Sequence, residues 1–218
     1  MPTTIRIINP NSNTEVTQGM SAALDALHMA DGPVLDCVTL ESGPAGIESQ
    51  ADVAMVEPML AEFIKSDNEA DAFVIGCYSD PGLALCREVT SRPVFGIAEC
   101  AVLTALTRGS AFGVISILAN SVARHMRHLR ERLLHAHCAG DRPIGLTVAE
   151  CEADPNAFDR IVDVGKVLRD EDGADVLILG CTGMAKHRIR LEGALGVPVI
   201  DPTQAAATMA IGAVQLAR

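Results

Sequence analysis

The sequence predicts an α/β protein made of two pseudo-symmetric lobes, each a mostly parallel sheet flanked by helices, with a ligand cleft between them. Two observations predict this class. Short segments rich in β-branched residues alternate along the chain with longer segments of helical spacing, which is typical of parallel sheets covered by helices. The segment that begins at residue 70 also recurs at residue 174, so the second half of the chain repeats the first.

The strands are predicted from short aliphatic segments that end in turn-forming residues. The predicted strands are residues 5–8, 34–40, 72–76, 94–97, 111–117, 144–148, 176–180 and 197–200. Because parallel sheets bind ligands at the carboxyl ends of their strands, the residues that directly follow these segments are the candidates for a functional site.

The first helix is predicted from residues that follow the first strand. Its apolar residues repeat at the spacing of one buried helix face: Val16, Met20, Ala23, Leu24 and Leu27. Ser12 and Glu15 stand three residues apart, as in a capping box, so the helix is predicted to begin at Asn13.

The internal repeat is clearest around two cysteines. Residues 70–77 read ADAFVIGC and residues 174–181 read ADVLILGC, at a constant offset of 104 residues. Cys77 and Cys181 therefore occupy equivalent positions, each at the end of a predicted strand and before a predicted helix. Free N–H groups at a helix start favour a thiolate and lower its pKa, so each cysteine is placed to act as a base.

Two such thiols facing one cleft indicate a specific chemistry. One thiolate can remove a proton from a carbon atom while the opposite thiol delivers a proton to the other face, which inverts the stereocentre. The alternative is that both thiols are buried packing residues, as most free cysteines are. We assign that structural role to the other five cysteines, Cys37, Cys86, Cys100, Cys138 and Cys151.

Composition excludes several other classes of protein. The chain has a formal charge of -11 and few aromatic residues, which disfavours nucleic acid as a partner. Its apolar runs are too short to span a membrane. Seven cysteines without a CxxC pair, in a chain with no export signal, indicate reduced thiols and a cytoplasmic protein. A small molecule is the expected partner.

Several motifs together resemble a known family. They are INPNSNTE, the loop GPAGIES at residues 43–49, GCYSDPGL followed by REVTSRPVFGIAE, and LGCTGM. Over nearly the whole chain, the sequence is similar to the aspartate/glutamate racemase superfamily and, within it, to the hydantoin and allantoin racemases. The resemblance implies cofactor-independent racemisation in a homo-oligomer, with the active site in the cleft between the two lobes. It also places the last helix on the first lobe, so we expect lobe 1 at residues 1–97 plus 202–218 and lobe 2 at residues 98–201. Cys77 and Cys181 match the family's catalytic pair.

The remaining candidate site residues follow from the proposed proton transfer and from the turns around the two cysteines. Tyr78 and Ser79 replace an expected Phe-Gly pair, which leaves the shape of the substituent pocket open. Backbone N–H groups near Ser79, Thr182 and Gly183 are candidates to stabilise a developing oxyanion. Asn11 is either an amide donor to the substrate or a turn residue. The loop from Gly43 to Ile47 either closes over the ligand or only connects to the next helix.

Other features are assigned no function. The basic segment at residues 124–132 has the spacing of a solvated helix face. His135, His137 and Cys138 lack a second ligand cluster, so no metal is expected. Nucleotide-binding motifs are absent. Asp36, Glu41, Asp80 and Glu99 are possible charged neighbours of the site without an assigned role.

Three functions from different classes remain open at this stage. The first is a racemase of 5-substituted hydantoins or allantoin. The second uses the same scaffold as a lyase or isomerase, like arylmalonate decarboxylase or maleate isomerase, or as an amino-acid (Asp/Glu) racemase. The third is a non-catalytic binding protein. Two thiols at matching positions favour racemisation, because a decarboxylase needs only one proton donor.

Overall fold

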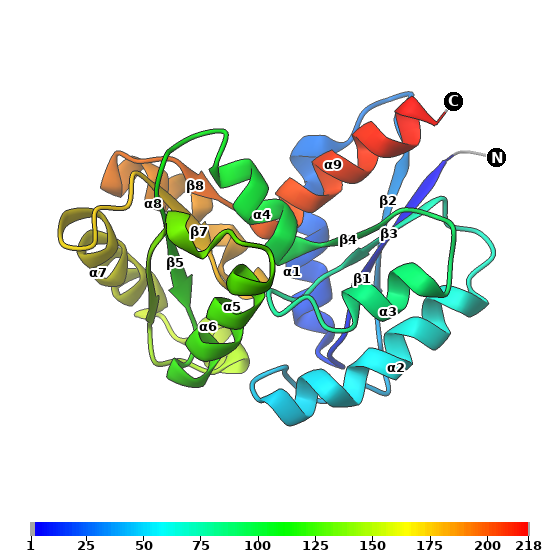
Figure 1. The fold of residues 1–218 in the computed structure, drawn as a ribbon, viewed down its shortest axis with the longest axis horizontal. Helices are drawn as coiled ribbons and strands as arrows, with labels where there is room; N and C mark the ends of the chain where they lie inside the picture. Colours follow the sequence, from blue (N-terminus) through cyan, green and yellow to red (C-terminus); the bar gives the residue numbers. More distant parts are fainter. Residues whose placement is uncertain (1–2, 218) are drawn as a thin grey trace.

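Two four-stranded parallel sheets, one from each half of the chain, form the centre of the structure (Figure 1). We describe residues 3–217 of a computed structural model. The first sheet has the order β2-β1-β3-β4 and the second the order β6-β5-β7-β8. The strands are β1 Thr4–Asn9, β2 Val34–Thr39, β3 Ala72–Ile75, β4 Val94–Gly96, β5 Phe112–Ser116, β6 Cys138–Pro143, β7 Val176–Leu179 and β8 Val199–Ile200. The predicted α/β class with two similar sheets is confirmed.

Helices cover the faces of both sheets (Figure 1). They are α1 Thr14–Leu24, α2 Gln50–Ser66, α3 Leu83–Glu88, α4 Ile97–Ala105, α5 Ala119–Glu131, α6 Val148–Ala153, α7 Ala157–Asp170, α8 Arg188–Leu195 and α9 Pro202–Leu216. The last helix, α9, contacts β1, β3 and β4, so the end of the chain returns to the first sheet. The exact lobe boundaries, 1–97 plus 202–218 and 98–201, stay a prediction.

One predicted strand is wrong. We predicted a strand at residues 144–148, but the edge strand β6 is Cys138–Pro143 and α6 begins at Val148. The alternation of Ile144, Leu146 and Val148 is real, because all three side chains are buried. Ile144 and Leu146 belong to a loop that packs on the core, and Val148 begins α6. The half-exposed edge strand carries too few apolar residues to give a strand signal.

The start of the first helix also differs from its prediction. The N-cap is Asn13, whose side chain accepts a hydrogen bond from the Glu15 backbone N–H at 3.0 Å. Ser12 instead bonds to the Pro44 carbonyl oxygen through its backbone N–H and its hydroxyl. The predicted capping box is therefore wrong, while the buried face with Val16 and Met20 is confirmed.

The glycine before each repeated cysteine lies against the neighbouring strand. The Gly76 N–H donates to the Ile8 carbonyl at 2.8 Å, and the Gly180 N–H donates to the Ile115 carbonyl at 2.8 Å. A Cβ atom at residue 180 would lie 2.7 Å from the Ile115 oxygen, which is closer than van der Waals contact allows. Only glycine lets the chain turn at this position without moving the strand beside it.

We expect Gly180→Ala to lower the free energy of unfolding by about 1–3 kcal/mol, because the new methyl group meets rigid backbone. Urea unfolding followed by circular dichroism would measure the change. Gly193→Ala in α8 is the matched control, since a Cβ atom there has nothing within 4 Å. The control should be neutral or stabilising, because alanine is the better helix former. Equal stability of the Gly180→Ala variant and the wild type would contradict this account.

None of the helices in residues 3–217 is long and apolar enough to cross a membrane.

Candidate active site

A cavity lies where the carboxyl ends of strands from both sheets approach each other. This is the position at which open parallel sheets bind ligands. Residues from both halves of the chain line it: Asn11, Ile47, Gly76, Cys77, Tyr78, Ser79, Ile117, Ser121, Arg124, His125, Val148, Gly180, Cys181 and Thr182. The repeat therefore brings its two Gly-Cys motifs to one cavity.

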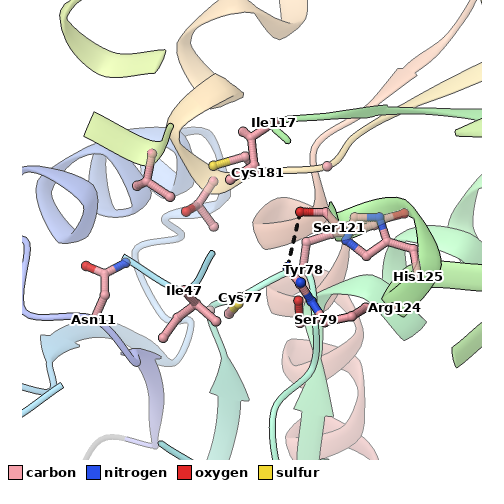
Figure 2. A pocket seen from close by; sticks show the side chains of 14 residues that line it. Asn11, Ile47, Cys77, Tyr78, Ser79, Ile117, Ser121, Arg124, His125 and Cys181 are labelled. Carbon is pink, nitrogen blue, oxygen red and sulfur yellow. Dashed lines mark hydrogen bonds between the residues drawn. The ribbon is translucent and has the colours of Figure 1, made fainter. Parts of the chain in front are cut away.

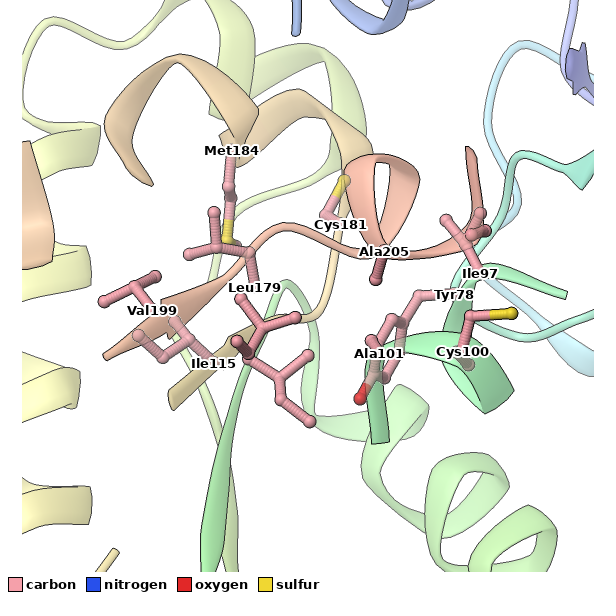
Figure 3. Packing of buried hydrophobic residues seen from close by; sticks show 14 of the residues in the cluster. Tyr78, Ile97, Cys100, Ala101, Ile115, Leu179, Cys181, Met184, Val199 and Ala205 are labelled. Atoms are coloured by element: carbon pink, nitrogen blue, oxygen red, sulfur yellow. The ribbon is translucent and has the colours of Figure 1, made fainter. Parts of the chain in front are cut away.

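The two cysteines follow equivalent strands. Cys77 comes two residues after β3 and is partly buried. Cys181 comes two residues after β7, is 7% exposed and packs among buried residues of the hydrophobic core (Figure 3). Figure 2 shows them on different sides of the cavity, with Asn11 and Ile47 to one side and Arg124 to the other. Cys181 is the residue before the short 3-10 helix Thr182–His187, as the sequence predicted for a cysteine at a helix start.

The surroundings of Cys77 differ from the prediction. No helix begins directly after it, because residues 77–80 form a turn closed by the Asp80 N–H and the Cys77 carbonyl oxygen at 2.9 Å, and α3 begins only at Leu83. Burial raises the pKa of the Cys77 thiol to about 11, with a further increase from Asp80; hydrogen bonds from Ser79 and the charge of Arg124 act in the opposite direction. The predicted lowering of this pKa is wrong.

Asp80 links the turn that carries Cys77 to the start of α4. Its carboxylate is completely buried and accepts hydrogen bonds from the backbone N–H groups of Ala98 at 2.9 Å and Glu99 at 2.8 Å, in the first turn of α4. Burial raises the pKa of this carboxyl group to about 7. The residue has a φ of 42°, a backbone conformation that aspartate tolerates better than most side chains. Asp80 therefore has a structural role that spacing alone did not reveal.

Asn11 combines both roles that the sequence left open. Its side-chain oxygen accepts hydrogen bonds from the Asn9 side chain at 3.0 Å and from the Asn13 backbone at 2.9 Å, which is the local turn role. The side chain is 5% exposed, and in Figure 2 its amide nitrogen points toward the cavity. The local bonds thus orient the amide as a donor to a bound molecule. That donor role stays a prediction.

The other candidate residues divide into two groups. Tyr78, Ser79, Thr182 and Ile47 line the cavity, whereas Gly43 and Gly183 are not among its lining residues. Gly43 packs against the backbone of the first loop, because a Cβ atom there would collide with the Pro10 carbonyl oxygen. Its need for glycine is explained by this close approach. Substrate binding by Gly43 and Gly183 stays a prediction.

The helix α5 forms a cavity wall that the sequence analysis missed. Ser121, Arg124 and His125 line the cavity, and Arg124 and His125 are only 9% and 6% exposed. The prediction that residues 124–132 form a solvated face is therefore wrong for its first two residues. Positions 121, 124 and 125 lie on one helix face, since they are separated by three and four residues. Their position after β5, which corresponds to that of α1 after β1, is the signal that could have found them.

A buried polar cluster supports His125. Its Nδ1 lies 2.8 Å from Asp141 Oδ2 and 3.3 Å from Ser116 Oγ, and Ser116 also donates to Asp141. The ring of Tyr78 packs edge-on against the imidazole, with ring centroids 4.9 Å apart. Asp141 lies on the edge strand β6, which was placed incorrectly from the sequence. These contacts fix the orientation of the imidazole in the cavity wall.

Comparison with known proteins assigns this geometry to a family. Residues 5–210 match the family model described as Asp/Glu/Hydantoin racemase. The chain belongs to the Asp/Glu/hydantoin racemase family. The expected superfamily is thereby confirmed, and the match extends across both sheets of this racemase-family fold.

Individual relatives agree with the family assignment. The chain is 40% identical over 210 residues to a hydantoin racemase of Rhizobium meliloti, with 94% of this chain and 86% of that protein covered. It is 37% identical to a hydantoin racemase of Pseudomonas sp. (strain NS671), with 90% and 80% covered. Among solved structures, allantoin racemase from Klebsiella pneumoniae has a TM-score of 0.93 at 31% identity, with 99% and 89% covered. The predicted enzyme class, an isomerase of the racemase type, is confirmed.

The described part of the chain contains no cluster of metal-ligand side chains. Among the described side chains of residues 3–217, which do not include that of Glu152, no group of three His, Cys, Asp or Glu residues has the geometry to hold a metal ion. His135 and His137 are exposed, and the Cys138 thiol lies 3.6 Å from the Gly140 carbonyl oxygen.

Proposed function

We propose that the protein racemises 5-substituted hydantoins or allantoin by proton transfer between Cys77 and Cys181, without a cofactor. The observation that carries the proposal is the presence of both repeated cysteines in the wall of one cavity, each after an equivalent strand. The names of the relatives at 40% and 37% identity and of the Klebsiella pneumoniae structure support the substrate class.

The proposed reaction uses the two sulfurs on opposite faces of the substrate carbon. The Cys181 thiolate removes the proton from C5 of one enantiomer, and negative charge develops on the adjacent carbonyl oxygen. The Cys77 thiol then delivers its proton to the other face, which leaves Cys77 as the thiolate and Cys181 as the thiol. That form of the enzyme acts on the opposite enantiomer, so the two protonation states alternate and no proton is gained or lost.

In the proposed reaction, two groups of donors stabilise the developing oxyanion. The backbone at Thr182 begins the short helix after Cys181, and the Asn11 amide lies across the cavity. Preorganised donors of this kind are most effective where water is excluded. The raised pKa of Cys77 suits it to the role of proton donor in the first half-reaction, because a thiol with a pKa of about 11 keeps its proton at neutral pH.

Racemisation would be tested with a panel of single enantiomers after dialysis against a chelator. The single enantiomers are hydantoins with aliphatic and aromatic substituents, allantoin, aspartate and glutamate. An arylmalonate, which is achiral, is added to test for decarboxylation. We expect loss of optical rotation with hydantoins or allantoin and none with the free amino acids. Racemisation of aspartate or glutamate alone, or carbon dioxide release from the arylmalonate, would replace this proposal by one of the alternatives.

The raised pKa of Cys77 predicts slow alkylation at neutral pH. Burial holds the pKa at about 11, so at pH 7 about one molecule in 10⁴ carries the thiolate that reacts with iodoacetamide. The rate should rise about tenfold per pH unit until pH approaches 11, because the thiolate fraction rises in that way. Mass spectrometry of the peptide that contains Cys77 would give the rate, with glutathione as the reference thiol. A plateau below pH 9 would contradict the prediction.

A further inference from the structure

We propose that Arg124 selects substrates whose 5-substituent ends in a carboxylate, an inference that rests on the proposed hydantoin chemistry and names its substrate class. The proposed function specifies the reacting carbon and the two cysteines, but it does not specify the substituent on that carbon. In this chain the cavity wall formed by α5 carries Ser121, Arg124 and His125 where an apolar substituent would need aliphatic or aromatic side chains.

The guanidinium of Arg124 is buried without an anionic partner. Its Nη1 donates to the Asn120 carbonyl oxygen at 3.2 Å, and its Nη2 donates to Ser121 Oγ at 3.1 Å and more weakly to the Glu48 carbonyl oxygen at 3.4 Å. Its Nε is buried and has no hydrogen-bond partner. Within residues 3–217, no carboxylate oxygen forms an ion pair with this guanidinium; Asp52 acts on it only through space.

A buried cation in this state favours an anionic ligand. Removing a charged group from water costs several kcal/mol unless a counter-charge and hydrogen bonds compensate it. Neutral backbone and hydroxyl acceptors satisfy only some of the five N–H groups of arginine. A carboxylate supplies both the missing charge and an acceptor for Nε, and guanidinium and carboxylate match each other in geometry. A neutral substituent would leave the charge uncompensated.

The position of Arg124 fits a substituent rather than the hydantoin ring. Figure 2 shows its side chain beside Ser79 and on the side of the cavity away from Asn11. A second, smaller pocket adjoins the cavity, and the two share Tyr78, Ser79, Arg124 and His125 as lining residues. A ring held between the two sulfurs can therefore extend a short chain toward Arg124.

Arg124 has one competing role, which the experiment must separate. Its charge also favours the Cys77 thiolate. If that were its main task, removing it would slow every substrate equally and would shift the pH dependence of the rate. If Arg124 binds the substituent, its removal would lower kcat/KM only for substrates that carry the carboxylate, mainly through a higher KM.

The test measures kcat/KM for three hydantoins with each of three enzymes: the wild type, Arg124→Gln and Arg124→Lys. The substrates are 5-(2-carboxyethyl)hydantoin, its amide isostere 5-(2-carbamoylethyl)hydantoin, and 5-isobutylhydantoin, each as a single enantiomer. We expect Arg124→Gln to lower kcat/KM for the acid by at least ~30-fold, as for removal of one partner of a buried charged pair, and to leave the two neutral substrates within about 3-fold. Arg124→Lys should retain part of the preference, because it keeps the charge but loses the planar donors.

Arg127→Gln is the matched control, because Arg127 is an exposed arginine on the same helix that bonds to Gln50 at 2.7 Å and does not line the cavity. Circular dichroism and thermal unfolding verify that each variant is folded. A uniform loss across all three substrates with a shifted pH profile would overturn the proposal, as would a wild type that does not prefer the acid. A wild type that racemises allantoin but none of the three hydantoins would overturn only the proposal for Arg124. A wild type that racemises neither the hydantoins nor allantoin would overturn the proposed function itself.

Discussion

Cys77→Ser and Cys181→Ser are each expected to lower the rate of racemisation by ~10²–10⁴-fold in both directions, the range that a positioned acid or base contributes. A serine hydroxyl fills nearly the same space but is a far weaker acid than a thiol. One face of the substrate would then lack a proton acceptor or donor, and inversion requires both faces. Chiral chromatography of hydantoin enantiomers would measure the initial rates.

The control for these variants is Cys37→Ser. Cys37 lies on β2, is partly buried as Cys77 is, and does not line the cavity. This variant should racemise at close to the wild-type rate, and all three should show the same circular dichroism spectrum as the wild type. Near wild-type activity in either catalytic variant would show that another group supplies the proton, and Asp80 would be the first to examine.

Asp80→Ala is expected to lower the free energy of unfolding by about 2–4 kcal/mol, because it leaves two buried backbone N–H groups without acceptors. The Ala98 and Glu99 N–H groups now bond to this carboxylate, and the Asp80 N–H closes the turn that carries Cys77. Alanine also fits the positive φ of this position poorly. Loosening the turn displaces the Cys77 sulfur, so we expect a loss of kcat together with the loss of stability.

A matched control exists in the second half of the chain. The Asp175 carboxylate also accepts two backbone N–H bonds, from Ser110 at 2.9 Å and Ala111 at 3.0 Å, but this site is exposed to solvent and distant from the cavity. Water can replace its bonds, so Asp175→Ala should cost less stability and leave kcat unchanged. Urea unfolding and initial rates on both variants would decide. Equal effects of the two substitutions would contradict the proposed role of Asp80.

The fold and the cysteine pair were predictable because their signals are local. An aliphatic run followed by Gly-Cys indicates the end of a buried parallel strand, and its recurrence places Cys77 and Cys181 in equivalent positions. The glycine is required by the adjacent strand carbonyl, which explains why the motif is retained in both halves. Topology then brings both strand ends to one cavity without further information.

The polar wall of the cavity was not predictable in the same way. Arg124 and His125 have the composition of a solvated helix face, and only the packing of α5 against the cavity buries them. The pKa of Cys77 depends on burial and on the delayed start of α3, neither of which a strand-and-helix pattern specifies. The strand β6 was missed because an edge strand is half exposed and its sequence lacks an apolar alternation.

The central claim, that each sulfur serves one face of the substrate, is tested most directly by deuterium uptake in the two cysteine variants. Each variant keeps one competent thiol, which can still exchange the C5 proton of the enantiomer that faces it. Mass spectrometry would follow both enantiomers of one hydantoin in deuterium oxide, with non-enzymatic exchange subtracted. We expect Cys77→Ser and Cys181→Ser each to exchange a single enantiomer without inverting it, and to select opposite enantiomers. Exchange of the same enantiomer by both variants, or of both enantiomers by either one, would contradict the two-thiol account.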